Sequence, residues 1–272
     1  MRLSTKIVFS FLVLIIAVIW AGIVQAPSNT FKLSVLNVGQ GDSIFIQTID
    51  GQNVLVDGGP DDSVLNQLSQ MMPFYERHID AIFLTHPHSD HLFGLIQVLK
   101  RYQVDKVYLT GVVYTTNDYL EFLNIIKDKN ISSQAVKAGD KISFSNAKIT
   151  VLWPESDLSG KTIENLNDSS LVLSVKADDF TALLLGDLEI ENQEKLLNSK
   201  DLLDHYQIIK IAHHGSSNGY SEKLIDRIKP DSAVISVGED NKYGHPSSLV
   251  ISSLEAKGIK IYRTDRDGLL EF

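Results

Sequence analysis

The first 24 residues form the most apolar part of the chain. Residues 7–24 are eighteen uncharged and nearly all apolar residues, and Arg2 and Lys6 come before them. A run of this length is at the lower limit of what an α-helix needs to cross a bilayer. Basic residues that flank such a helix stay on the cytoplasmic side. The pattern therefore predicts one N-terminal transmembrane helix, with the rest of the chain outside the cytoplasm.

Two other interpretations fit the same run. A signal peptide would be cut after Ala26, but Pro27 disfavours cleavage and the run is long for the apolar region of a signal peptide. A buried core helix is disfavoured because no polar face interrupts the run. We expect residues 1–26 to be a membrane anchor, with secretion after cleavage as the alternative. Residues 27–30 would link it to a domain over residues 31–272.

From residue 31 onward, short apolar runs alternate with segments of helical periodicity. Strands are expected at 32–38, 43–48, 53–56, 79–84, 106–109, 132–136, 141–144, 147–152, 170–175, 180–185, 207–211, 233–237, 260–263 and 269–272. Helices are expected from about residue 61 and at 91–101, 117–127, 189–197, 221–228 and 247–256. This mixture favours an α/β fold in which packed sheets are covered by helices outside. The four-layer α/β/β/α sandwich is one such fold, but the pattern alone does not select it.

Composition limits what this domain can bind. The 272 residues carry a formal net charge of −9. Binding nucleic acid by bulk electrostatics requires Lys and Arg to neutralise phosphates, so the acidic balance argues against it. A phosphate substrate would have to be held by metal ions and a few local cations. The chain has no cysteine, which excludes disulfides and thiolate ligands and leaves His, Asp and Glu to hold a metal.

Three histidines and an aspartate directly follow the expected strand 79–84. His86, His88, Asp90 and His91 occupy six consecutive positions, in a chain with only eight histidines. A loop at the end of a strand can bring side chains together without disturbing the core. Imidazole and carboxylate are ligands that zinc and similar metals prefer. A solvated polar turn is the alternative, and the density of histidines argues against it.

Four further positions would complete a metal centre, although each signal is weaker alone. Asp187 follows a buried strand, where a carboxylate could bridge two metals or simply form a turn. His213 and His214 follow another strand, and on an extended backbone only one of the two rings would face the metals. His245 lies in a loop after a third strand. Asp57 could orient a ligand histidine or belong to a turn.

The motif His86-x-His88-x-Asp90-His91 resembles the signature of the metallo-β-lactamase superfamily. Other segments resemble the nuclease-like C-terminal domain of the ComEC family of competence proteins, in the same order. They are Leu36-Asn37-Val38-Gly39-Gln40-Gly41-Asp42-Ser43, Asn167-Asp168-Ser169-Ser170-Leu171-Val172, Gly186-Asp187, His213-His214-Gly215-Ser216, Tyr243-Gly244-His245-Pro246 and Arg263-Thr264-Asp265-Arg266-Asp267-Gly268. The resemblance implies the four-layer αββα sandwich, with a site for two divalent metal ions, zinc or manganese, where the sheets meet.

The resemblance also implies roles for individual residues. His86 and His88 would hold one metal, Asp90 and His91 the other, Asp187 would bridge them, and His245 would complete the second site. The catalytic residues would be Asp90 together with His213 and His214, one of which would be a ligand or the acid that protonates the leaving oxygen.

The chain departs from the wider superfamily in one region. Many members have a further histidine between the first motif and the bridging aspartate, where this chain has Asn167 and Asp168. The first metal would then be bound more loosely, or be held by Asn167, Asp168 or water.

Asp42 and Asp57 are expected just outside the ligands. Candidate phosphate contacts are Lys210, Lys242 and Arg263, for each of which a solvated side chain is the alternative.

Three functions fit these observations. The first is a membrane-anchored phosphodiesterase that cleaves DNA outside the cytoplasm, with a water shared by two cations as nucleophile. The second is a two-metal hydrolase of a small ester, lactone or amide. The third is a binding module without catalysis. ComEC proteins have a multi-pass channel before this domain, whereas this chain has one apolar segment, so a role in DNA uptake does not follow from the resemblance.

Overall fold

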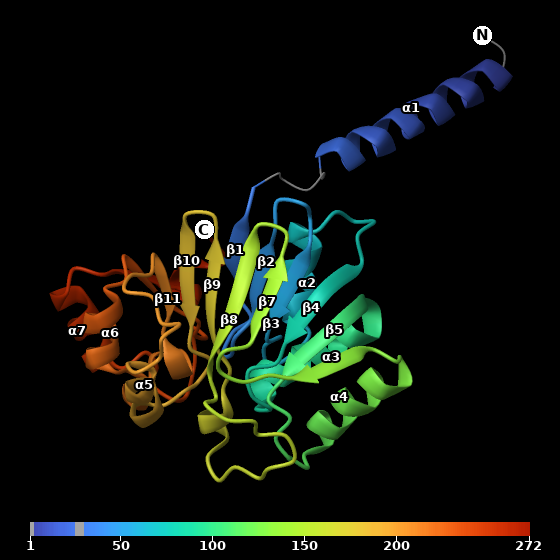
Figure 1. Ribbon diagram of the computed structural model, residues 1–272. Helices are drawn as coiled ribbons and strands as arrows, with labels where there is room; N and C mark the ends of the chain where they lie inside the picture. Colours follow the sequence, from blue (N-terminus) through green and yellow to red (C-terminus); the bar gives the residue numbers. More distant parts are fainter. Residues whose placement is uncertain (1–2, 25–29) are drawn as a thin grey trace.

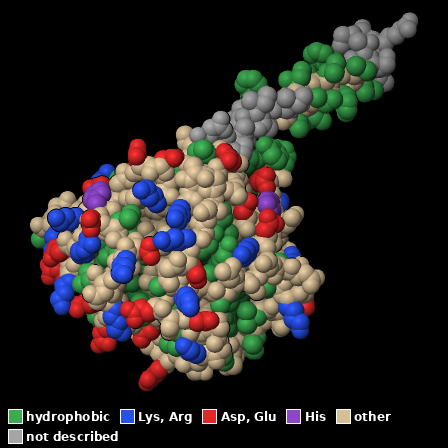
Figure 2. All heavy atoms as spheres, viewed as in Figure 1, with side chains coloured by type: hydrophobic (Ala, Val, Ile, Leu, Met, Phe, Trp, Pro, Cys, Tyr) green, Lys and Arg blue, Asp and Glu red, His purple; other side chains and the backbone are tan. Residues whose placement is uncertain are grey.

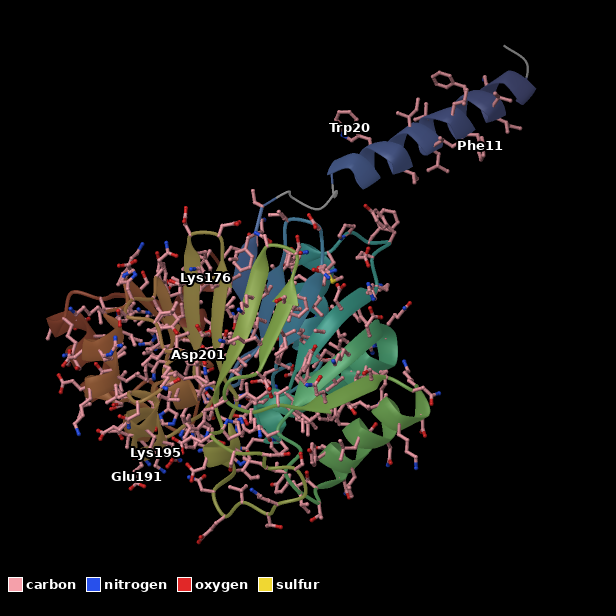
Figure 3. All side chains as sticks on the ribbon, in the orientation of Figure 1. Phe11, Trp20, Lys176, Glu191, Lys195 and Asp201 are labelled. Carbon is pink, nitrogen blue, oxygen red and sulfur yellow. The ribbon has the colours of Figure 1, made fainter. Side chains whose placement is uncertain are left out.

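The computed structural model describes residues 3–24 and 30–272. The N-terminal segment forms the helix α1 (Leu3–Val24), and its labelled side chains Phe11 and Trp20 are exposed (Figure 3). Within those described ranges, no helix combines the length and the hydropathy that crossing a membrane requires. The predicted linker and the candidate cleavage site fall largely on residues 25–29, outside the described residues.

Two seven-stranded sheets are present in the described part of the chain (Figure 1). The first sheet has the order β14-β1-β2-β3-β4-β5-β6 and the second β13-β12-β11-β10-β9-β8-β7. The first contains β1 (Lys32–Val35), β2 (Ile44–Gln47), β3 (Asn53–Val56), β4 (His78–Phe83), β5 (Gln103–Leu109), β6 (Ser132–Ala135) and β14 (Leu270–Glu271). The second contains β7 (Lys141–Phe144), β8 (Ala147–Trp153), β9 (Val172–Ala177), β10 (Phe180–Leu184), β11 (Ile208–Lys210), β12 (Ser232–Ile235) and β13 (Lys260–Arg263).

Helices cover the outer face of each sheet. The first sheet packs against α2 (Ser63–Met71), α3 (Ser89–Arg101) and α4 (Asn117–Asp128). The second packs against α5 (Ile190–Leu196), α6 (Glu222–Ile228) and α7 (Ser248–Ala256). The short segments are α8 (Thr264–Asp267) and the 3₁₀ turns η1 (Leu166–Ser169), η2 (Ala212–Gly215) and η3 (Ser217–Gly219). The domain therefore has the order helix, sheet, sheet, helix.

Strand β3 shows why each sheet is covered on both faces. Val54 and Val56 pack into the core between the two sheets, whereas Leu55 packs under the helices of the first sheet. Successive side chains of a strand point to opposite faces, so a strand covered on both faces is apolar at every position. Burying one such side chain contributes about 1.5–3 kcal/mol.

The prediction of packed sheets with outer helices is confirmed, whereas several boundaries were wrong. The strand expected at 32–38 ends at Val35, because the chain turns after Leu36, where the Val38 amide donates to the Leu36 carbonyl at 3.1 Å. The turns η1 to η3 and helix α8 were not predicted, since elements of three or four residues carry no recognisable periodicity.

The motif loops meet because of strand direction. Strand β3 is parallel to β4, and β10, β11 and β12 are parallel to one another. Asp57, the His86 motif, Asp187 and the pair His213 and His214 all follow the carboxyl ends of these strands. In α/β sheets, ligands bind at this edge.

A candidate metal centre

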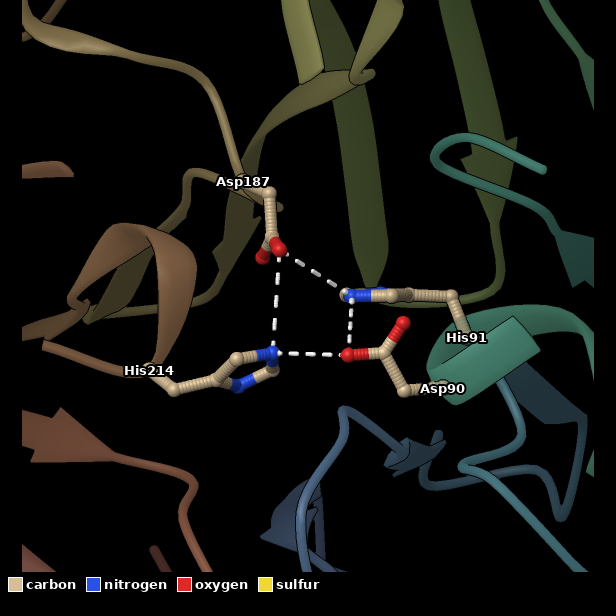
Figure 4. Close-up of side chains that lie close together, drawn as sticks. All are labelled: Asp90, His91, Asp187 and His214. Carbon is tan, nitrogen blue, oxygen red and sulfur yellow. Dashed lines mark hydrogen bonds and ion pairs between the residues drawn. The ribbon is translucent and has the colours of Figure 1, made fainter. Parts of the chain in front are cut away.

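Four side chains converge at that edge: Asp90, His91, Asp187 and His214 (Figure 4). One ligand atom from each lies within 4.8 Å of the others. The Asp187 Oδ2 atom is 3.4 Å from His91 Nε2 and 3.6 Å from His214 Nε2. The Asp90 Oδ2 atom is 3.2 Å from His214 Nε2 and 4.0 Å from His91 Nε2. The cluster thus joins the start of α3 to loops of the second sheet.

His86 and His88 extend the cluster on one side. His86 Nε2 lies 2.9 Å from His88 Nδ1 and 4.0 Å from Asp187 Oδ2. The rings of His86 and His91 are 4.2 Å apart between centroids. His86, Asp90 and His91 therefore lie close to Asp187, and His88 directs a ring nitrogen atom toward His86.

Asp57 fixes the orientation of His91. Its carboxylate lies 2.8 Å from His91 Nδ1 and accepts hydrogen bonds from the Thr85 amide at 2.8 Å and the Thr85 hydroxyl at 2.7 Å. With Nδ1 bound to Asp57, Nε2 is the atom directed at Asp187. Sequence reasoning missed Thr85, although it directly precedes the motif.

Two glycines allow the loop after β3 to approach helix α3. The Gly58 amide donates to the His91 carbonyl at 2.7 Å, and the Gly94 amide donates to the Gly59 carbonyl at 3.0 Å. A Cβ atom on Gly94 would lie 1.9 Å from the Gly58 oxygen. Glycine at these positions brings Asp57 within reach of His91.

The prediction of an extended backbone at His213 and His214 was wrong. Both residues adopt left-handed conformations, with φ of 50° and 54°. Non-glycine residues in this region cost of order 1–3 kcal/mol each and cluster at functional sites. One ring does face the cluster: His214 Nδ1 donates to the Ser236 carbonyl at 3.0 Å, which directs Nε2 to Asp90 and Asp187. The ring of His213 lies beside His245, with centroids 5.8 Å apart.

Lys210 does not contact solvent, contrary to its predicted role as a phosphate contact. The residue is 1% exposed and forms an ion pair with Asp42. Its Nζ atom also donates to the Gly186 carbonyl at 3.3 Å and lies 4.0 Å from Asp187 Oδ1. Asp42 Oδ1 in turn lies 3.5 Å from His214 Nδ1. The pair is a support behind the cluster and cannot reach a substrate.

Other predicted residues lie outside the cluster. Asn167 donates to Glu189 at 3.1 Å and Asp168 accepts from Asn192 at 2.7 Å, and neither belongs to the four-residue group. Lys242 is exposed, and Arg263 is paired with Asp265.

A cavity of about 360 Å³ opens over the cluster. Its floor includes Asp90, Asp187 and His214. The other lining residues are Gln40, Pro87, His88, Ser89, Leu92, Tyr114, Thr116, Asp118, His213, Tyr243 and His245. His245 was predicted to complete the second metal site. It lines the cavity but lies outside the four-residue group. Within that group, His214 is the histidine of the second sheet next to Asp187. Sequence reasoning missed Gln40, Tyr114, Thr116 and Asp118.

The charged groups of the cluster shift one another's pKa values. Burial disfavours the charged form of each group, but the carboxylates of Asp187 and Asp42 outweigh it and raise the pKa of His214 to about 9. Burial also opposes the charged form of His91, but Asp187 and Asp57 raise the pKa of His91 well above its ordinary value. In the same way, His91 and His214 hold the pKa of Asp187 well below the ordinary value for a carboxyl group. Burial lowers the pKa of His86 well below its usual range. The ionised carboxylates therefore require nearby positive charge, from imidazolium or from metal ions.

Unpartnered atoms show that the residues fit divalent cations. Asp187 Oδ1 and His91 Nε2 are buried without a hydrogen-bond partner. A buried polar atom left unsatisfied costs about 1–3 kcal/mol, which a bound cation would remove. Imidazole and carboxylate suit zinc and manganese alike. The nitrogen and oxygen atoms of His86, His88, Asp90, His91, Asp187 and His214 would hold such ions.

This fold and this constellation define a known class of protein. The family model of the metallo-beta-lactamase superfamily matches residues 36–239, and the chain belongs to that superfamily. The fold is similar to that of the metallo-beta-lactamase fold protein YhfI from Bacillus subtilis, with a TM-score of 0.58, 12% identity, and 89% of this chain and 100% of that chain covered. It is also similar to that of Zn²⁺-bound PqqB from Methylobacterium extorquens, with a TM-score of 0.56 and 13% identity. That match covers 89% of this chain and 99% of that chain.

Within the superfamily, the chain resembles ComEC-like competence proteins. It is 28% identical to ComE operon protein 3 of Bacillus subtilis (strain 168), over 90% of this chain and 33% of that protein. It is 27% identical to Competence protein ComA of Neisseria gonorrhoeae, again over 90% of this chain and 33% of the relative. The chain thus spans about a third of the length of these relatives.

Proposed function

We propose that this chain is a metal-dependent phosphodiesterase that cleaves DNA. The observation that carries the proposal is the convergence of Asp90, His91, Asp187 and His214, three of which form the floor of an open cavity, with His86 and His88 beside the group. The similarity to proteins named for competence supports DNA as the substrate.

The residues around the centre have separate roles in this proposal. When bound, a pair of divalent cations supplies Lewis-acid polarisation and lowers the pKa of water. Asp57 keeps the His91 ring in one tautomer, and the Asp42–Lys210 pair supports Asp187 and His214 from behind. The ring of His213 lines the cavity and is placed to give a proton to the departing oxygen.

One observation favours a second function, hydrolysis of a small ester, lactone or amide. Of the described residues that line the cavity, none is Lys or Arg, whereas Asp90, Asp118 and Asp187 are acidic. A neutral substrate would enter such a cavity without repulsion, while a phosphodiester requires the metal ions to offset the carboxylates.

The purified chain should be incubated with Mn²⁺ or Zn²⁺ and either single-stranded DNA or a panel of small esters, lactones and amides. The control is Asp187→Ala. DNA cleavage that the control loses supports the proposal. Hydrolysis of small substrates alone supports the second function, and a chain that takes up no metal would be a binding module without catalysis.

The N-terminal sequence supports a location outside the cytoplasm for the domain. Arg2 and Lys6 precede the uncharged run 7–24, the arrangement of an anchor with its following domain exported. Alkaline phosphatase fused after Phe272 should be active in cells, because this reporter folds only after export. Recovery of the fusion in membranes indicates an anchor, and recovery in the medium indicates cleavage. An inactive fusion would contradict export.

A further inference from the structure

An exposed aromatic ring stands at the rim of the cavity. Tyr243 lines the cavity and is 60% exposed. Its ring stacks on that of His245, with centroids 5.9 Å apart and planes inclined by only 17°. Asn241 holds the loop, because its side chain donates to the Gly238 carbonyl at 2.9 Å and the His245 carbonyl at 2.7 Å. The ring of Tyr243 therefore packs against His245 and remains largely exposed to solvent.

We propose that Tyr243, supported by His245, is the platform on which one nucleobase of the substrate stacks beside the metal centre. This inference rests on the proposed function and names the part of the substrate that the cavity recognises. Every base has a π-face, so an aromatic platform binds single-stranded nucleic acid without a sequence preference. His213 lies between this platform and the cluster, since its ring is 5.8 Å from that of His245 and 6.1 Å from that of His214.

The charge of the cavity favours such a platform. With no Lys or Arg among its described lining residues, contacts to phosphate from cationic side chains cannot supply affinity there. The ammonium of Lys242 lies over the Tyr243 ring, 5.4 Å from its centre, so a base that stacks there displaces this flexible side chain toward solvent. At about 360 Å³ the cavity is near the lower end for small-ligand sites, so it accommodates one nucleotide unit.

The test compares a single-stranded oligonucleotide with an abasic one of the same length. The wild-type chain, Tyr243→Ala and Tyr243→Phe are measured for binding by fluorescence anisotropy in EDTA and for cleavage with Mn²⁺. Tyr75→Ala is the matched control, because Tyr75 is 54% exposed and does not line the cavity. Circular dichroism checks that each variant is folded.

We expect wild type and Tyr243→Phe to bind the normal oligonucleotide about tenfold more tightly than the abasic one. Tyr243→Ala should lose this difference, with a KM for the normal oligonucleotide raised about tenfold and an unchanged KM for the abasic one. Equal binding of the two oligonucleotides by wild type, or a preference retained by Tyr243→Ala, overturns the inference even if DNA is cleaved. A preference that depends on Tyr243 without any cleavage supports the platform and overturns the phosphodiesterase proposal instead.

Discussion

At the scale of single residues, the Asp42–Lys210 pair determines how the cluster tolerates substitution. Both side chains are buried, and Asp42 also faces His214 and His91. Removing one member of a buried ion pair leaves an unpaired charge, which costs about 3–5 kcal/mol. Replacing both members removes the charge together with its partner.

Lys210→Met should lower the free energy of unfolding by about 3–5 kcal/mol in EDTA, measured by urea denaturation. The double variant Asp42→Asn/Lys210→Met should recover much of the loss. The exposed Lys242→Met is the control and should change stability by less than about 0.5 kcal/mol. A loss below about 1 kcal/mol in Lys210→Met would show that the ammonium is not paired as described.

The Asp57 carboxylate is expected to control metal affinity through His91. Asp57→Asn keeps an oxygen for the Thr85 amide but loses the charge that holds the His91 ring. Loss of such a partner typically weakens metal binding 10- to 100-fold, so we expect a decrease of about that size. Competition with a chromogenic chelator measures it. Asp168→Asn, at a carboxylate outside the cluster, should bind metal as wild type does, and equal affinities in all three proteins would refute the role of Asp57.

At the scale of elements, the contact between helix α3 and the β3–α2 loop sets the geometry of the site. Alanine is favoured over glycine inside a helix by about 1 kcal/mol, so propensity alone would make Gly94→Ala stabilising. A Cβ atom there would instead lie 1.9 Å from the Gly58 carbonyl oxygen. Either the helix or the loop must move, and Asp57 would separate from His91.

We therefore expect Gly94→Ala to lower the free energy of unfolding by about 1–3 kcal/mol and to weaken metal binding. Gln97→Ala, one turn further along α3, is the control and should leave both unchanged. Urea denaturation and chelator competition measure the two effects. A Gly94→Ala protein with wild-type metal affinity would show that the site does not depend on this contact.

Sequence patterns predicted the elements better than the positions of side chains within them. The His86 motif, Asp187 and Asp57 could be assigned to strand ends because a strand's length and apolarity are local properties. The burial of Lys210 could not be predicted, because it depends on a partner 168 residues away. The left-handed backbone of His213 and His214 was missed for a related reason: tertiary contacts such as the bond to Ser236 hold it, and no local pattern encodes it.

At the scale of the whole molecule, the distribution of charge favours a site that contacts only one or two nucleotides of a nucleic acid. The chain has 34 acidic and 25 basic residues. On the face seen in Figure 2, blue and red side chains are interspersed. A protein that follows a nucleic-acid backbone needs a continuous basic surface, because each neutralised phosphate releases counterions. Here the contacts expected are the metal centre and one stacked base.

Salt dependence of cleavage tests this picture. For single strands, the slope of log affinity against log salt is about −0.7 for each phosphate neutralised. With one or two phosphates held, the slope of log(kcat/KM) for a single-stranded oligonucleotide should be no steeper than about −1.4. Lys242→Met should reduce it by no more than about 0.7, because Lys242 is one cation beside the platform. A slope of about −4 or steeper would mean that an extended basic surface binds the strand. The substrate would then lie across the domain, and would not enter the cavity one nucleotide at a time.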